Sequence, residues 1–118
     1  MRQIFVFGSN LAGKHYGGSA SHAVTSHGAE IGNGVGMQGD SYAIPTLDGE
    51  FRKLPLKVIA EHVGAFLWFA AMHPEWTFNV VAIGCGIAGF SPTEIAPMFK
   101  DATSNVILPA EFTKEQAA

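Results

Sequence analysis

The chain has 118 residues, 47% of them hydrophobic and 14% charged, a balance typical of a globular domain and not of a disordered chain. The formal net charge is −3 and the seven Lys and Arg residues are scattered, so we expect no nucleic-acid polymer as a partner, because duplex binding needs a concentrated basic surface. One cysteine excludes an internal disulfide, and no apolar run suits a signal peptide or a membrane span, which predicts a cytoplasmic protein with no membrane partner.

The first half of the chain predicts two strands and one helix. Residues 4–7 are β-branched and aromatic and end at a glycine, as in a buried strand. Residues 19–27 follow two glycines and are closed by a third, which favours a helix with a C-terminal glycine. Residues 28–40 contain five glycines and are not expected to be regular over their whole length. Residues 41–44 are an expected short strand that Pro45 stops.

The second half predicts two helices, two strands and a tail. Residues 54–73 carry apolar side chains at three- and four-residue steps behind an early proline, which indicates the clearest helix. Residues 78–83 are mostly apolar and predict a central strand. Residues 91–100 open with Ser-Pro-Thr-Glu, the pattern of a helix N-terminus with a capping box. Residues 105–108 are an expected final strand, and residues 109–118 an expected C-terminal tail.

Strands that alternate with helices over this length predict an α/β fold with three α/β/α layers around a central mixed, largely parallel sheet. The chain contains no repeat, no low-complexity tract and no linker, so we expect one domain over residues 1–118, with its core in residues 3–108. In open sheets of this kind ligands bind at the carboxyl ends of the strands.

Two glycine-rich segments follow the two most apolar predicted strands. FGSNLAGKHYGG covers residues 7–18 and IGCGIAGFSP covers residues 83–92, and each leads into an expected helix. Helix N-terminal N–H groups beside glycine-rich backbone suit a phosphate, and two such loops face to face suit a diphosphate. A tight turn explains either loop alone equally well. The GxGxxG pattern of Gly84, Gly86 and Gly89 lies too late in the chain for a Rossmann fingerprint.

These segments carry a family resemblance. FGSNLAGKHYGGSASHAV resembles the first ligand loop of macrodomains, and VVAIGCGIAGFSPTEIAPMF resembles the second. SYAIPT followed by LPLKVIAEHVGAFLWFA is similar to the branch that contains ADP-ribosyl-glutamate hydrolases, and compact phage-related macro-like proteins look most alike. The resemblance covers residues 3–108 and implies the cytosol of a bacterium or of a phage-infected host.

The resemblance implies binding of ADP-ribose or a related nucleotide, with the diphosphate between the loops and an ADP-ribosylated protein as a further potential partner. Asn10 matches the asparagine beside the distal ribose and is the candidate catalytic residue. The implied ligand-binding residues are Asn10, His15, Gly17 and Gly18 of the first loop, and Gly84, Cys85, Gly86, Ile87, Ala88, Gly89 and Phe90 of the second. No cofactor and no metal are implied.

Departures from the family pattern leave the activity open. The glutamate-specific hydrolases carry a lysine and an aspartate where this chain has Leu47 and Ala88, so their covalent chemistry is not carried over. Asp48 lies one residue beyond, and its spacing does not make it a substitute. The usual upstream aspartate that reads adenine is absent as well. Three functions remain: a reader or sequestering protein, a hydrolase acting at the distal ribose, and a protein that binds a cyclic ADP-ribose-type signal.

The other reactive side chains give weaker indications. Cys85 lies between two glycines with no histidine near it in sequence, so a packed thiol is favoured over a nucleophile. His15 is the best placed histidine for a phosphate contact or acid–base work, and an exposed loop position without a task is the equal alternative. His22 and His27 are five residues apart, which does not place them on one helical face and argues against a metal site.

Overall fold

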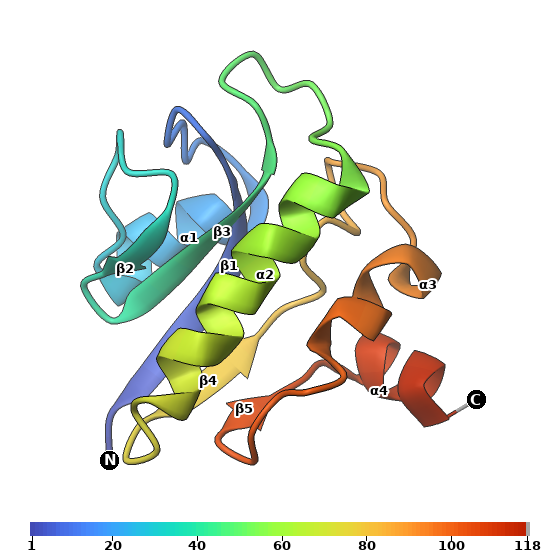
Figure 1. Ribbon diagram of the computed structural model, residues 1–118. Helices are drawn as coiled ribbons and strands as arrows, with labels where there is room; N and C mark the ends of the chain where they lie inside the picture. The colour runs from blue at the N-terminus through green and yellow to red at the C-terminus, as the bar shows by residue number, and fades with distance from the viewer. Residues whose placement is uncertain (118) are drawn as a thin grey trace.

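The computed structural model describes residues 1–117, and the side chains of residues 1–114. One mixed sheet runs through the molecule in the order β2-β3-β1-β4-β5 (Figure 1). Its strands are β1 (Gln3–Asn10), β2 (Gly36–Gln38), β3 (Ser41–Leu47), β4 (Thr77–Val80) and β5 (Val106–Ile107). The helices are α1 (Gly18–His27), α2 (Leu56–Ala71), α3 (Pro92–Ile95), the 3₁₀ helix η1 (Ala96–Phe99) and α4 (Ala110–Ala117).

Helices cover both faces of the sheet, which gives the expected three-layer α/β/α arrangement (Figure 1). Successive side chains of β1 point to opposite faces, as in any strand. Ile4 and Val6 belong to the larger apolar cluster, which also contains the buried residues of α2, η1 and α4. Phe5 and Phe7 contact the smaller cluster, which is formed with the alanines of α1. The alternating side chains of β1 therefore contribute to two separate hydrophobic clusters.

β1 lies at the centre of the sheet and pairs in parallel with both β3 and β4. Val6 is in register with Tyr42 on one side and with Val80 on the other. The predicted adjacency of the two apolar strands is thus confirmed. Because neighbouring parallel strands end at one edge, the two glycine-rich segments leave the sheet side by side.

Several strand boundaries differ from the prediction: β1 continues past Gly8 to Asn10, and β5 covers only Val106–Ile107. β3 does not stop at Pro45 but continues to Leu47, because Pro45 pairs with Ser9 just before a register shift in β1, where a missing N–H disturbs the ladder least. β4 ends at Val80 rather than at Ile83. The N–H of Val81 still donates to the carbonyl of Val6, and the chain then turns away from the sheet.

The predicted helix over residues 91–100 exists in two pieces. Its capping box is confirmed, since the Ser91 hydroxyl accepts from the N–H of Glu94 and the Glu94 carboxylate accepts from the N–H of Ser91. Pro97 lacks the N–H that a continuing α-helix requires, and the chain tightens there into η1.

The prediction of a tail over residues 109–118 is wrong, because residues 110–117 form α4. One side chain of this helix, that of Phe112, anchors it to the core. Phe112 is fully buried, and its ring stacks on that of Phe99 in η1 with 5.4 Å between centroids. α4 therefore belongs to the core and closes one side of the molecule (Figure 1).

We expect Phe112→Ala to lower the free energy of unfolding by about 3–5 kcal/mol, because the variant leaves a cavity against Phe99. Urea denaturation followed by circular dichroism measures the change. Trp68→Ala is the control, since Trp68 is mostly exposed on α2 and its loss should change stability by less than about 1 kcal/mol. Equal stability of the Phe112 variant and the wild type would show that α4 is not docked.

Candidate functional site

A pocket of about 560 Å³ opens at the carboxyl ends of β1, β3 and β4. Its lining comes from the end of β1 and the loop that follows, the N-terminus of α1, the end of β3 with the turn that follows, the loop after β4 with the first residue of α3, and α4. The pocket thus lies where the sequence places a ligand site in an open α/β sheet. The lining includes Asn10, Gly17, Gly18, Gly84, Cys85, Gly86, Ile87 and Ala88 of the predicted set.

The two glycine-rich loops face each other across this pocket. A Cβ atom added to Gly17 would lie 3.8 Å from Cδ1 of Ile87, which places the first loop against the second. Gly17 is the N-cap of α1, and within the described residues no side chain caps this helix. The first N–H groups of any α-helix lack intrahelical partners and carry the positive end of the helix dipole. The pocket wall therefore offers backbone donors suited to an anion.

The glycines of the second loop have different tasks. Gly84 has a φ of 77°, and a Cβ atom there would meet the Phe90 ring at 3.3 Å, so this glycine permits the turn itself. Gly86 has no heavy atom within 4 Å of an added Cβ and borders open space in the pocket wall. Gly84 shapes the loop, and Gly86 leaves room for a ligand.

Asn10 lies in the pocket wall and is 5% exposed, but its amide is already engaged. Its Nδ2 donates to the carbonyl oxygen of Lys14, and its Oδ1 accepts from the N–H of Lys14, both at 3.0 Å. One amide hydrogen and one lone pair remain for other partners. Asn10 therefore holds the turn over residues 10–14, and its contact with a ligand stays a prediction.

The alternative that His15 stands exposed on the loop is wrong, and its contact with a ligand stays a prediction. His15 is 3% exposed, is not among the described lining residues, and packs edge-on against Phe7 with 5.2 Å between ring centroids. Its Nε2 lies 2.8 Å from the carbonyl oxygen of Asn33 and donates to it, since a carbonyl only accepts. Nδ1 is buried without a hydrogen-bond partner among the described residues. His15 supports the loop from beneath.

Gly89 and Phe90 also fall outside the described lining of the pocket, and their expected place beside a ligand stays a prediction. Gly89 donates its N–H to the carbonyl of Gly86 at 3.0 Å and closes the second loop. The Phe90 ring packs into the larger cluster with the Lys53 ammonium 4.7 Å above it. Both residues support the loop.

The two positions that depart from the family pattern are in the pocket and are apolar. Leu47 ends β3 and Ala88 belongs to the second loop, and both are buried in the wall. Cys85 also belongs to the wall, and its Sγ is 3.5 Å from the carbonyl oxygen of Ile83. Partial burial has the largest effect on the pKa of the Cys85 thiol and raises it. The negative charges of Glu111 and Glu94 raise this pKa further. A protonated thiol fits the expected packing role.

The spacing argument applied to His22 and His27 is wrong. Their Nε2 atoms lie 3.3 Å apart at the C-terminus of α1, where the two rings also contact Phe5. Desolvation has the largest effect on the pKa of His27 and lowers it, and the electrostatic effect of His22 lowers it further. Among residues 1–117 no group of three or more His, Cys, Asp or Glu residues could hold a metal ion.

Several lining residues were not among the predicted ligand contacts, and those with a charged, hydroxyl or aromatic side chain at the pocket include Lys14, Thr46, Phe51 and Glu111. Lys14 had a signal, as the cation inside the first glycine-rich segment. Thr46 and Phe51 come to the pocket only because β3 runs through Pro45, and Glu111 only because residues 110–117 form a helix. Thr46, Phe51 and Glu111 therefore depend on elements whose extent the sequence pattern did not predict.

Comparison with known proteins gives no identification. No protein family, no curated protein and no solved structure matches the chain. Within the part that the structure describes, none of the helices is both long and apolar enough to cross a membrane. The site is therefore interpreted from its own geometry and from the resemblance of its two loops.

We expect Cys85 to react slowly with iodoacetamide at pH 7–8. The thiolate is the reacting form, and a raised pKa leaves less thiolate at a given pH than in a free cysteine. The rate should be lower in the native protein than in the same chain unfolded in urea, and should rise toward it as the pH is increased. Mass spectrometry of timed samples measures it. Faster labelling in the native state would instead indicate an activated nucleophile.

Proposed function

We propose that the protein binds ADP-ribose or a related adenine nucleotide, with the diphosphate between the loops after β1 and β4. The observation that carries the proposal is the opposition of the uncapped N-terminus of α1 and the glycine loop around Gly86 across one pocket. Backbone N–H groups at a helix N-terminus favour phosphate oxygens. Lys14 adds a positive charge to the same wall.

The nucleotide itself is proposed from the resemblance of both loops to macrodomain loops. The size of the pocket supports a ligand of this kind, because a cavity of about 560 Å³ lies in the range that small molecules and cofactors occupy. Leu47 and Ala88 favour binding over covalent catalysis, since neither offers a nucleophile or an acid.

Gly86→Val tests the binding proposal. The branched side chain would enter the space proposed for the phosphates, and apart from the two adjacent residues no described part of the protein lies within 4 Å of its Cβ. We expect the affinity for ADP-ribose to fall at least about tenfold, or about 1.4 kcal/mol, with the unfolding temperature unchanged. Calorimetric titration and thermal denaturation are the measurements.

Gly64→Val is the matched control, because Gly64 also borders open space but lies on α2 outside the described lining. Its affinity should equal that of the wild type. If Gly86→Val also binds ADP-ribose like the wild type, the second loop is only a turn and the proposal fails.

Hydrolysis at the distal ribose is the second candidate, and Glu111 is the observation that favours it. Glu111 belongs to the pocket wall, and its carboxylate can serve as a general acid or base. If the protein is a hydrolase, Glu111→Gln should slow release of ADP-ribose from modified protein by roughly 10²-fold or more while binding persists. Wild-type protein that binds but releases nothing above background would leave binding as the function.

A further inference from the structure

The turn between β3 and α2 holds Phe51 in an unusual backbone conformation. Its φ is 64°, and no other non-glycine residue among residues 1–117 has a positive φ. Bulky residues rarely adopt this left-handed conformation, and positions that keep it cluster at ligand sites. Phe51 is 49% exposed and belongs to the pocket wall. The protein therefore maintains a strained backbone while presenting an aromatic ring to the pocket.

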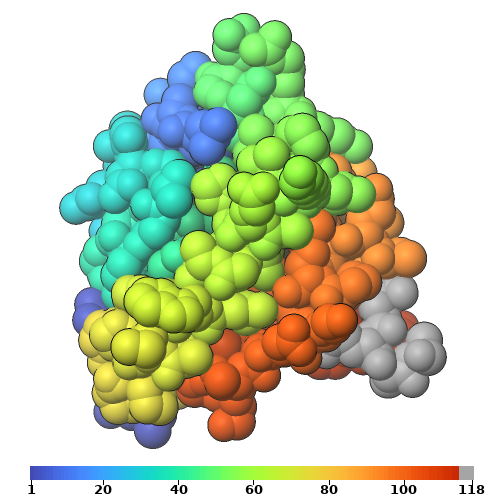
Figure 2. Space-filling view, in the orientation of Figure 1, coloured from blue at the N-terminus to red at the C-terminus, as the bar shows by residue number. Residues whose placement is uncertain are grey.

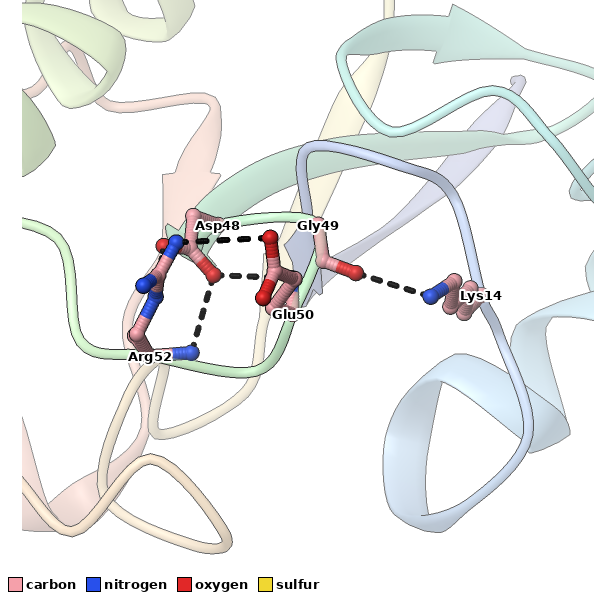
Figure 3. Close-up of polar contacts among 5 residues, drawn as sticks. All are labelled: Lys14, Asp48, Gly49, Glu50 and Arg52. Atoms are coloured by element: carbon pink, nitrogen blue, oxygen red, sulfur yellow. Dashed lines mark hydrogen bonds and ion pairs between the residues drawn. The ribbon is translucent and has the colours of Figure 1, made fainter.

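Hydrogen bonds fix this turn from within (Figure 3). The Asp48 carboxylate accepts from the backbone N–H groups of Glu50 and Arg52, at 2.8 and 3.0 Å, and from Nε of Arg52 at 2.9 Å. These backbone donors lower the pKa of Asp48, so the carboxylate stays charged near neutral pH. The N–H of Phe51 donates to the carbonyl of Asp48 at 3.2 Å. The ring is therefore carried by a preformed turn.

Lys14 ties the turn to the first glycine-rich loop. Its Nζ donates to the carbonyl of Gly49 at 2.8 Å and lies 5.3 Å from the centroid of the Phe51 ring. Figure 3 shows the lysine reaching from its own loop to the turn. In Figure 2 the first loop, in blue, touches the green segment that follows β3 at the top of the molecule. The ammonium group of Lys14 thus lies over the aromatic ring of Phe51, and both residues belong to the pocket wall.

We infer that Phe51 is the stacking surface for the planar base of the bound nucleotide, with Lys14 beside it as the counter-ion of the adjoining phosphate. The inference rests on the proposed function and extends it to the base. Stacking uses the π face that all bases share, so the site holds a base without reading its edge. An ammonium group attracts a phosphate as a point charge. The ligand class is therefore a nucleotide whose base stacks close to a phosphate.

The test compares ligands with and without a base. Calorimetric titration uses AMP, GMP and UMP against ribose 5-phosphate, and ADP-ribose in parallel. We expect the wild type to bind the three mononucleotides roughly tenfold more tightly than ribose 5-phosphate. Phe51→Gly and Phe51→Leu should remove this difference, and Phe51→Tyr should keep it. Trp68→Leu, which alters an exposed aromatic outside the described lining, is the matched control.

Folding of the variants is checked by thermal denaturation. Phe51→Gly should unfold at or above the wild-type temperature, because glycine adopts a φ of 64° without strain. A loss of base-dependent affinity in a variant of undiminished stability would separate binding from folding.

The outcomes distinguish the inference from the function on which it rests. If ADP-ribose binds but Phe51→Gly binds every probe as the wild type does, the inference is overturned and the proposed function stands. If AMP or GMP binds through Phe51 while ADP-ribose does not, the inference stands and the proposed ligand is overturned. If the wild type binds no probe, or prefers none over ribose 5-phosphate, the inference fails.

Discussion

The parallel pairing of β1 with both β3 and β4 is the constraint on which the pocket depends. It brings the ends of three strands to one edge, so the loops that leave them must share that edge. The two apolar faces of β1 pack against different helices, and this fixes the register that sets where each loop begins. The site is thus a product of the sheet, with each loop contributing only its local turn.

The sequence predicted the architecture well because the architecture depends on local patterns. The apolar run before Gly8, the three- and four-residue steps of α2 and the Ser91–Glu94 capping box each act within a few residues, and each element begins within two residues of its predicted start. The two glycine-rich loops could be predicted to face each other because the strands that precede them were predicted to be neighbours. Eight of the eleven predicted site residues line the pocket for this reason.

The features of the site that the sequence did not predict depend mainly on contacts between residues that are not neighbours in the chain. His15 is buried because Phe7 and the carbonyl of Asn33 surround it, and neither is close to it in sequence. The amide of Asn10 is occupied by the turn that it stabilises. Phe51 reaches the pocket on a turn built by the Asp48 carboxylate. Periodicity and spacing carry no information about such partners.

The docking of α4 has a consequence for the order in which the chain folds. Phe99 in η1 is covered by Phe112, so the larger cluster is incomplete until residues 110–117 can form their helix. Residues 110–117 come after all five strands in the chain, and a domain generally folds as a unit once its elements are all present. Until then the ring of Phe99 and the β4 side of the sheet present apolar surface to the cell. Docking of residues 110–117 onto η1 is therefore the step that completes the core.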